Sequence, residues 1–167
     1  MSLTETATGK CLIAVRIRGM PRAHPEIKTT LKLLKLLKKH NAMIFYETPS
    51  IKGMLEKVKD LITWGEATEE SIYLLLSKRG KTINGEKLTD EKVKEKFGFN
   101  SIKDLAKAIF NGEVSLKKLH ELNLPFRLNS PSKGFKGSIK KPFKIGGELG
   151  YRGKEINNLI ARMVWLI

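Results

Sequence analysis

The residue types that carry enzyme chemistry are few in this chain and widely spaced. Its three histidines are His24, His40 and His120, and no pair has a spacing suited to one metal ion. The single cysteine, Cys11, opens a run of β-branched and apolar residues, which favours a buried or edge thiol over a nucleophile. The acidic residues stand mostly at expected helix starts or beside lysines, where capping and surface pairing explain them better than acid–base catalysis. The sequence therefore predicts no enzyme, no metal site and no cofactor.

One glycine-rich segment invites comparison with a phosphate-binding loop. It contains Gly146-Gly147, Gly150 and Gly153-Lys154. The interval from Gly147 to Gly153 is one residue too long for that loop, and Glu155 stands where Ser or Thr would hold magnesium. A nucleotide-dependent enzyme stays open only as an alternative, which saturable ATP binding would support.

The abundant functional side chains are cations, whose chemistry is phosphate neutralisation. The chain has 32 Lys and Arg against 17 Asp and Glu, a net charge of +15 and a pI of about 9.9. Residues 1–63 carry 12 basic against 5 acidic residues, residues 64–122 carry 11 against 10, and residues 123–167 carry 9 against 2. A uniformly soluble surface would spread this charge. The pattern instead indicates a polyanion, most simply a nucleic acid, that touches the two ends and not the middle.

The predicted phosphate contacts are cations of those two ends. Four aromatic residues, Phe126, Phe135, Phe143 and Tyr151, are interleaved with the last group and would stack on exposed bases. The predicted contacts are Arg16, Arg18, Arg22, Lys28, Lys32, Lys35, Lys52, Lys133, Lys136, Lys140, Lys141, Lys144 and Arg152.

Hydrophobic periodicity predicts the elements that position these residues. Residues 11–64 read as strand, helix, strand, helix, strand, with helix starts at Pro25 and at Thr48-Pro49. The first helix is expected to run to about Asn41, so that Lys28, Lys32, Lys35 and Lys39 form one basic stripe on it. Both helices would cover one face of the sheet, leaving Arg16 and Arg18 on the other face.

The remaining segments have different characters. Residues 1–10 read as a flexible N-terminal tail without the features of a secretory signal, and no run is apolar enough to cross a membrane. Residues 65–122 form a helical extension, with helices expected at 68–80, 89–98, 101–112 and from Ser115. Residues 123–167 are a basic Gly/Pro-rich segment, mobile by itself, that ends in a helix over 154–163. The lone cysteine fits a reducing cytosol.

Several motifs together resemble one family. The stretch TLKLLKLLKKHNAMIFYETPSIKGMLEKVKDLI, residues 30–62, resembles the signature of the universal large-subunit ribosomal protein family L-thirty, called L-seven in eukaryotes. Met43 departs from its pattern, where a β-branched residue is usual. Further matching pieces are VRIRG (15–19), ITWGE (62–66), SKRG (77–80), LPFRLNSP (124–131) and GGELGYRGKEINNLIARM (146–163), as in archaeal-type members.

This resemblance implies a fold and a role. The fold class is α+β, a truncated ferredoxin-like three-stranded antiparallel sheet with two helices on one face and a helical extension. The implied role is a structural, non-enzymatic constituent of the large subunit of cytoplasmic ribosomes. Its partners would be large-subunit rRNA, with 5S rRNA nearby, and neighbouring ribosomal proteins, without a membrane, cofactor or small-molecule substrate. A free RNA-binding regulator or chaperone is the alternative, which would wash off large subunits in high salt.

Overall fold

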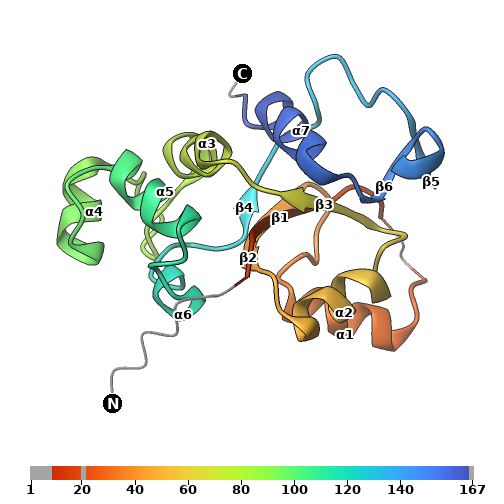
Figure 1. The fold of residues 1–167 in the computed structure, drawn as a ribbon, viewed down its shortest axis with the longest axis horizontal. Helices are drawn as coiled ribbons and strands as arrows, with labels where there is room; N and C mark the ends of the chain where they lie inside the picture. Colours follow the sequence, from red (N-terminus) through yellow and green to blue (C-terminus); the bar gives the residue numbers. More distant parts are fainter. Residues whose placement is uncertain (1–8, 20–21, 166–167) are drawn as a thin grey trace.

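The computed structural model describes residues 9–19 and 22–165, so the expected N-terminal tail over 1–10 lies almost wholly outside the described part. The first unit alternates strands and helices as predicted (Figure 1). β1 lies between β2 and β3 and pairs with both in antiparallel orientation. The elements of this unit are β1 (Cys11–Arg16), α1 (Pro25–Leu33), β2 (Asn41–Tyr46), α2 (Pro49–Lys57) and β3 (Ile62–Glu66).

The two helices of this unit start where the sequence places them. Each begins at a proline, whose missing N–H leaves no unsatisfied donor in the first turn. The Thr48 hydroxyl accepts a hydrogen bond from the N–H of Ile51 at 3.1 Å and so caps α2. Both helices cover one face of the sheet, where Leu31 and Leu55 join a buried cluster with Leu12 and Phe45.

The opposite face of the sheet is also covered, which overturns the expected position of Arg16. Ile13, Val15 and Ile17 point to this face and are buried against α3, α5 and α7. Because side chains alternate along a strand, Arg16 lies on the same side as Leu12 and Ala14, under α1 and α2. The sequence pattern gave the alternation correctly but assigned the two helices to the wrong face.

The helical extension follows the prediction closely. The side chains of its four expected N-caps, Thr68, Thr89, Ser101 and Ser115, each accept a hydrogen bond from the N–H three residues later. The buried Tyr46 hydroxyl reaches from β2 to the carbonyl oxygens of Ile109 (2.9 Å) and Val114 (2.7 Å), which fixes the extension to the sheet. The extension contains α3 (Glu69–Arg79), α4 (Asp90–Phe97), α5 (Ile102–Phe110) and α6 (Leu116–Leu119).

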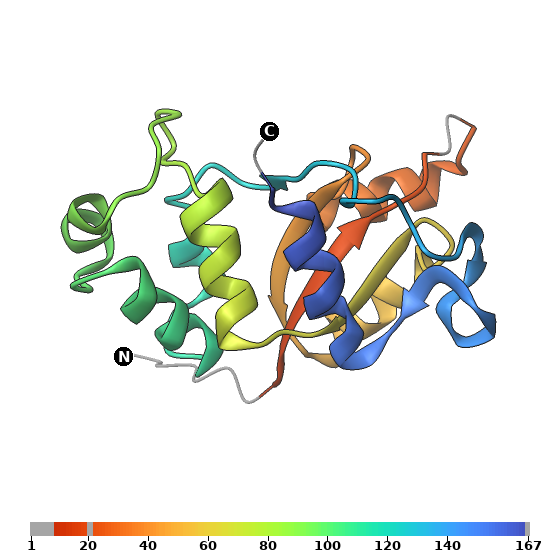
Figure 2. The same ribbon diagram turned by 90° about the horizontal axis from the view of Figure 1, so that it is seen from above.

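The basic Gly/Pro-rich segment is more regular than predicted. Instead of three strands, the sheet has six, in the order β4-β2-β1-β3-β6-β5, and this segment supplies the additional three. Its last helix, expected over 154–163, runs over Ile156–Met163 and packs beside α3 (Figure 2). The elements are β4 (Phe126–Arg127), β5 (Ser138–Pro142), η1 (Phe143–Ile145), β6 (Gly147–Tyr151), η2 (Gly153–Glu155) and α7 (Ile156–Met163).

Two glycines explain how these late strands reach the sheet. A Cβ atom on Gly65 of β3 would lie 1.8 Å from the carbonyl oxygen of Gly153, and one on Gly147 of β6 would lie 1.9 Å from that of Lys141. Only glycine permits such close backbone contact. Gly147, which belongs to the segment expected to be mobile by itself, therefore serves strand packing. In the described ranges no helix is both long and apolar enough to span a membrane.

Candidate nucleic-acid interface

One end of the sheet gathers loops that the sequence separates widely. β1 and β4 end there, and β2, β3, β6 and β5 begin there. The loops that cross this end are the segment after β1, the turn over residues 34–40 and the segment 128–137 (Figure 2). We call this surface the basic end; its cations, all exposed or half-buried, are Arg18, Lys35, Lys38, Lys39, Lys133 and Lys136.

The turn over residues 34–40 replaces the last part of the expected first helix. α1 ends at Leu33, and Lys35 takes a left-handed backbone conformation with φ of 59°. The N–H of Leu36 donates to the carbonyl oxygen of Leu31 and the N–H of Lys35 to that of Lys32, which is the hydrogen-bond pattern of a Schellman motif. The predicted stripe is therefore wrong beyond Lys32. Glycine usually marks such a stop, so a lysine in its place gave no signal.

Arg16, a predicted phosphate contact, faces the protein interior instead. Its side chain is buried, with 7% of its residue surface exposed. Its guanidinium donates to the carbonyl oxygens of Arg18 (3.1 Å), Leu36 (3.2 Å) and Leu37 (2.6 Å). Burial lowers the pKa of Arg16, and these three carbonyls compensate the buried charge. Arg16 thus ties the end of β1 to the turn over 34–40 and positions the cations that both segments carry.

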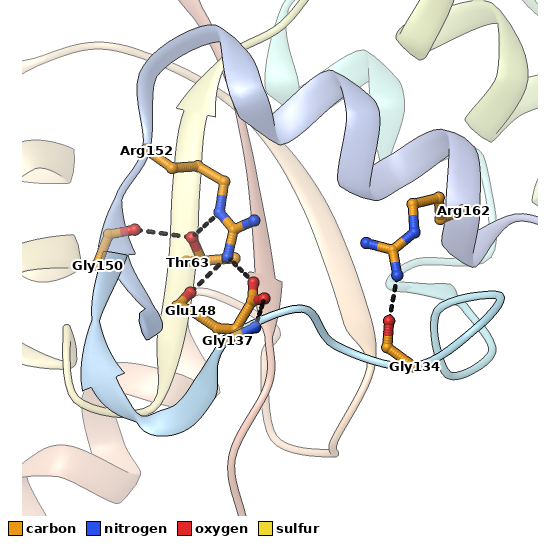
Figure 3. Close-up of polar contacts among 7 residues, drawn as sticks. All are labelled: Thr63, Gly134, Gly137, Glu148, Gly150, Arg152 and Arg162. Carbon is orange, nitrogen blue, oxygen red and sulfur yellow. Dashed lines mark hydrogen bonds and ion pairs between the residues drawn. The ribbon is translucent and has the colours of Figure 1, made fainter. Parts of the chain in front are cut away.

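Arg152 is turned inward in the same way (Figure 3). It is 8% exposed, and its guanidinium donates to the Thr63 hydroxyl (2.7 Å) and to the carboxylate of Glu148 (2.6 Å). The Phe143 ring lies 4.9 Å from the guanidinium carbon. Glu148 in turn accepts from the N–H of Gly137 at 2.8 Å. The predicted phosphate contact is instead the centre of a buried network that fixes β5 and β6 to β3.

A third arginine, Arg162, holds the loop over residues 132–134, although it is not among the predicted contacts. Arg162 of α7 donates to the carbonyl oxygens of Ser132 (3.0 Å) and Gly134, as Figure 3 shows for Gly134. Lys133, between them, has a left-handed backbone with φ of 65°. The fixed loop therefore presents the Lys133 side chain to solvent. No sequence signal distinguishes Arg162 from the other cations.

His40 joins the turn over 34–40 to the last segment. Its N–H donates to the Arg16 carbonyl (2.7 Å), its carbonyl accepts from the N–H of Leu128 (3.2 Å), and its ring lies 6.4 Å from that of Phe135. Burial and the charge of Lys39 lower the pKa of His40, so the ring is neutral at neutral pH. This histidine is a packing residue, in line with its isolation in the sequence.

The other predicted contacts fall into three groups. Lys28 and Lys32 are exposed on α1, and Arg22 is exposed before it. Lys140, Lys141 and Lys144 are exposed on the edge strand β5 and on η1, beside the basic end. Lys52 lies apart, because α2 starts at the opposite end of the sheet, where Lys52 lines a hollow with Glu47, Glu56 and Glu66. Of the four aromatics, Phe126 is buried in the core and unavailable for stacking.

The exposed cations of this surface lack carboxylate partners. The ion pairs among described residues are Lys57–Glu26, Lys92–Glu86, Lys118–Glu121 and Arg152–Glu148, and none involves them. A set of fixed, uncompensated cations on one surface is suited to the phosphates of a folded polyanion. Residues 9–19 and 22–165 contain no cluster of His, Cys, Asp and Glu suited to a metal ion. Burial raises the pKa of Cys11 to about 12, so its thiol is protonated and unreactive.

Comparison with known proteins adds a family to this geometry. Residues 12–62 match the family model described as ribosomal protein L30p/L7e. A protein of Ignicoccus hospitalis named large ribosomal subunit protein uL30 is 46% identical over 156 residues, covering 93% of this chain and 98% of the relative. Proteins with the same name from Staphylothermus marinus (49% identity, 90% and 96% covered) and Nanoarchaeum equitans (49%, 89% and 96%) are similar over equally large shares. These matches confirm the resemblance found in the sequence motifs: the chain belongs to the ribosomal protein L30p/L7e family, in its archaeal-type form.

Proposed function

We propose that this chain is a structural constituent of the large ribosomal subunit that binds and stabilises large-subunit rRNA. The observation that carries the proposal is the basic end, where cations from three separate segments lie together. They have no carboxylate partner among the described residues, and their loops are held by hydrogen bonds of Arg16, Arg152 and Arg162. The archaeal relatives are named as proteins of the large ribosomal subunit, and we take the assembly from these names. Membership in this family also supports a non-enzymatic role in the cytoplasmic ribosome.

The proposed phosphate contacts are the exposed cations that remain after Arg16, Arg152 and Lys52 are set aside. A protein that neutralises six to ten phosphates loses roughly a thousandfold or more in affinity between about 50 and 200 mM salt. The contacts are Arg18, Arg22, Lys28, Lys32, Lys35, Lys133, Lys136, Lys140, Lys141 and Lys144, joined by Lys38 and Lys39 of the turn.

Three finer statements belong to the same proposal. Residues 11–64 would act as a truncated ferredoxin-like unit, supported by the antiparallel β2-β1-β3 order with both helices on one face. Residues 65–122 would brace that unit, supported by the Tyr46 contacts, and residues 123–167 would extend its RNA surface. A location near 5S rRNA rests on the motif resemblance alone, and rRNA footprinting with and without the protein tests it.

Charge reversal tests the proposal. We expect the variant Lys38→Glu, Lys136→Glu, Lys140→Glu to be lost from large subunits that are sedimented through high salt. The matched control is Lys94→Glu, Lys103→Glu, Lys107→Glu, which reverses three exposed lysines of α4 and α5 and should be retained. Equal retention of both variants would refute the placement of the RNA surface. A wild-type protein that binds RNA but washes off the subunits would instead identify a free regulator.

A further inference from the structure

A second basic surface lies where the nearly neutral helical extension meets the start of the last segment, residues 123–127. A hollow of about 440 Å³ opens between the end of α3, the segment that follows it and the segment leading into β4. Its size is that of pockets that hold small ligands. Among the described residues, five cations and no carboxylate line it: the cations are Lys78, Arg79, Lys81, Lys87 and Arg127.

Backbone pairing explains why these cations converge. Residues 80–88 fold back on themselves, with Lys81 opposite Lys87 in an antiparallel bridge. The N–H of Asn123 donates to the carbonyl oxygen of Lys81 at 2.8 Å, which brings the segment before β4 alongside. Arg127 follows on β4, opposite Asn41 of β2. The hollow therefore lies close to the turn over 34–40, and the basic end continues into it.

The cations of the hollow are poorly compensated within the protein. Glu86, the nearest acidic residue in sequence, is paired with Lys92 instead. Lys81 and Lys87 stand directly opposite each other, and like charges in that position destabilise a strand pair. Arg79 is fixed by donating to the carbonyl oxygens of Val164 (3.3 Å) and Trp165 (2.9 Å). A bound anion would reduce the repulsion between Lys81 and Lys87, which no acidic side chain of the hollow offsets.

The remaining wall of the hollow is apolar. Leu124 and Pro125 line it and are half-buried. An inorganic anion makes no use of such a wall, whereas a nucleotide places a phosphate among cations and a base against apolar or planar groups. The guanidinium plane of Arg127 offers a second stacking surface. A base inside a duplex is stacked on both sides and cannot enter a hollow of this size.

We propose that this hollow binds one unstacked nucleotide of an RNA strand, with its phosphate among Lys81, Lys87 and Arg127 and its base against Leu124 and Pro125. The inference rests on the proposed function in taking RNA as the partner. It goes beyond that function because it assigns an RNA contact to the helical extension. The charge distribution along the sequence predicted no RNA contact there.

Binding of short RNAs to the full-length chain tests this assignment. The probes are a fluorescein-labelled single strand of about ten uridines and a blunt duplex of the same length, followed by anisotropy at two salt concentrations. The variant Lys81→Gln, Lys87→Gln, Arg127→Gln is compared with Lys94→Gln, Lys103→Gln, Lys107→Gln, which removes the same charge from α4 and α5. We expect the hollow variant to bind the single strand about tenfold more weakly than the control variant and with a smaller salt slope. Both variants should bind the duplex alike.

A second readout does not depend on the variants folding. Wild-type protein is crosslinked to the single strand carrying 4-thiouridine, and the modified peptides are mapped by mass spectrometry. Crosslinks within residues 78–87 or 123–127 support the proposal. Crosslinks confined to other segments, or equal losses of single-strand affinity in both variants, overturn it. If polyglutamate bound the hollow variant more weakly than the control variant while both variants bound the single strand alike, the occupant would be an acidic peptide and the proposal would fall.

The two proposals fail in distinguishable ways. If the hollow variant behaves like its control while the Lys38, Lys136 and Lys140 reversals are still lost from large subunits, only the inference about the hollow falls. If wild-type protein neither binds RNA nor sediments with large subunits, the proposed function falls with it.

Discussion

Replacing Arg152 by methionine separates a residue that positions the basic surface from one that contacts phosphate. The guanidinium lies 2.6 Å from the Glu148 carboxylate, and both side chains are almost completely buried, at 5% and 6% exposure. After Arg152→Met, Glu148 keeps only the N–H of Gly137 as a partner in the described network. Removing one partner of a buried ion pair costs about 3–5 kcal/mol, because the other charge is left without compensation. We expect a loss of that size in the free energy of unfolding.

Three further variants identify the cause of the loss in unfolding free energy. Glu148→Gln keeps the side-chain shape but removes the negative charge, so it should also destabilise the fold. In the double variant no charge is stranded, and the loss should be smaller than the sum of the two single losses. Lys154→Met, a control at an exposed position in η2, should change the stability by no more than about 0.5 kcal/mol. Urea denaturation followed by far-ultraviolet circular dichroism measures all four variants.

RNA binding gives the result that would refute the reasoning. If Arg152 acts by fixing β5 and β6, then Arg152→Met and Glu148→Gln weaken RNA binding together, below the temperature at which either unfolds. Arg152→Lys should not restore it, since one ammonium group cannot reach both the Thr63 hydroxyl and the Glu148 carboxylate in the guanidinium geometry. If Arg152→Met weakened RNA binding, Glu148→Gln did not, and stability changed by less than about 1 kcal/mol, then Arg152 would be a direct phosphate contact after all.

Three further outcomes follow from the same contacts. Arg16→Met removes three hydrogen bonds to carbonyl groups and should lower the free energy of unfolding by about 2–4 kcal/mol in urea denaturation, with no rescue by Arg16→Lys. Tyr46→Phe leaves the Ile109 and Val114 carbonyls without the hydroxyl and should cost about 1–3 kcal/mol, with hydrogen exchange accelerated in α5 first. Burial lowers the pKa of His40 below its usual 6.5, so the folded chain takes up this proton less readily than the unfolded chain and stability falls as the pH drops below that value. Asparagine tolerates the left-handed backbone at this position and does not titrate. The variant His40→Asn should therefore lose less unfolding free energy than the wild type when the pH falls from about 7.5 to 5.

Local signals in the sequence predicted the elements that depend on local chemistry. Prolines and hydroxyl caps fixed the starts of α1, α2 and the helices of the extension, because a cap is made by residues three or four apart. The buried face of α7 followed from its 3.6-residue period. The Schellman turn at Lys35 was missed, since its usual marker is glycine.

Features that depend on distant segments were not predictable in this way. The strands β5 and β6 have few β-branched residues and pair through Gly147, a close contact between segments that nothing in their composition announces. The inward orientation of Arg16 and Arg152 depends on carbonyls and a carboxylate whose positions exist only in the folded chain. The hollow beside Arg127 was not predictable for the same reason: the balanced segment 64–122 places four of its cations on one side, and only the folded chain brings Arg127 next to them.

The two basic residue types divide these tasks between them. Within the described ranges, four of the seven arginines donate side-chain hydrogen bonds to the protein itself, whereas only Lys92 and Lys118 do so among the far more numerous lysines. Loops that carry like charges repel one another, so a basic surface needs internal contacts that hold its loops in place. A guanidinium suits that task because its planar fork of five donors remains charged when buried and can bridge several carbonyls, while a lysine on a flexible stem is better suited to a phosphate at the surface. If RNA binds as proposed, the exposed lysines therefore predict its contacts better than the total positive charge does, and substitutions of Arg16, Arg79, Arg152 and Arg162 should act first on stability.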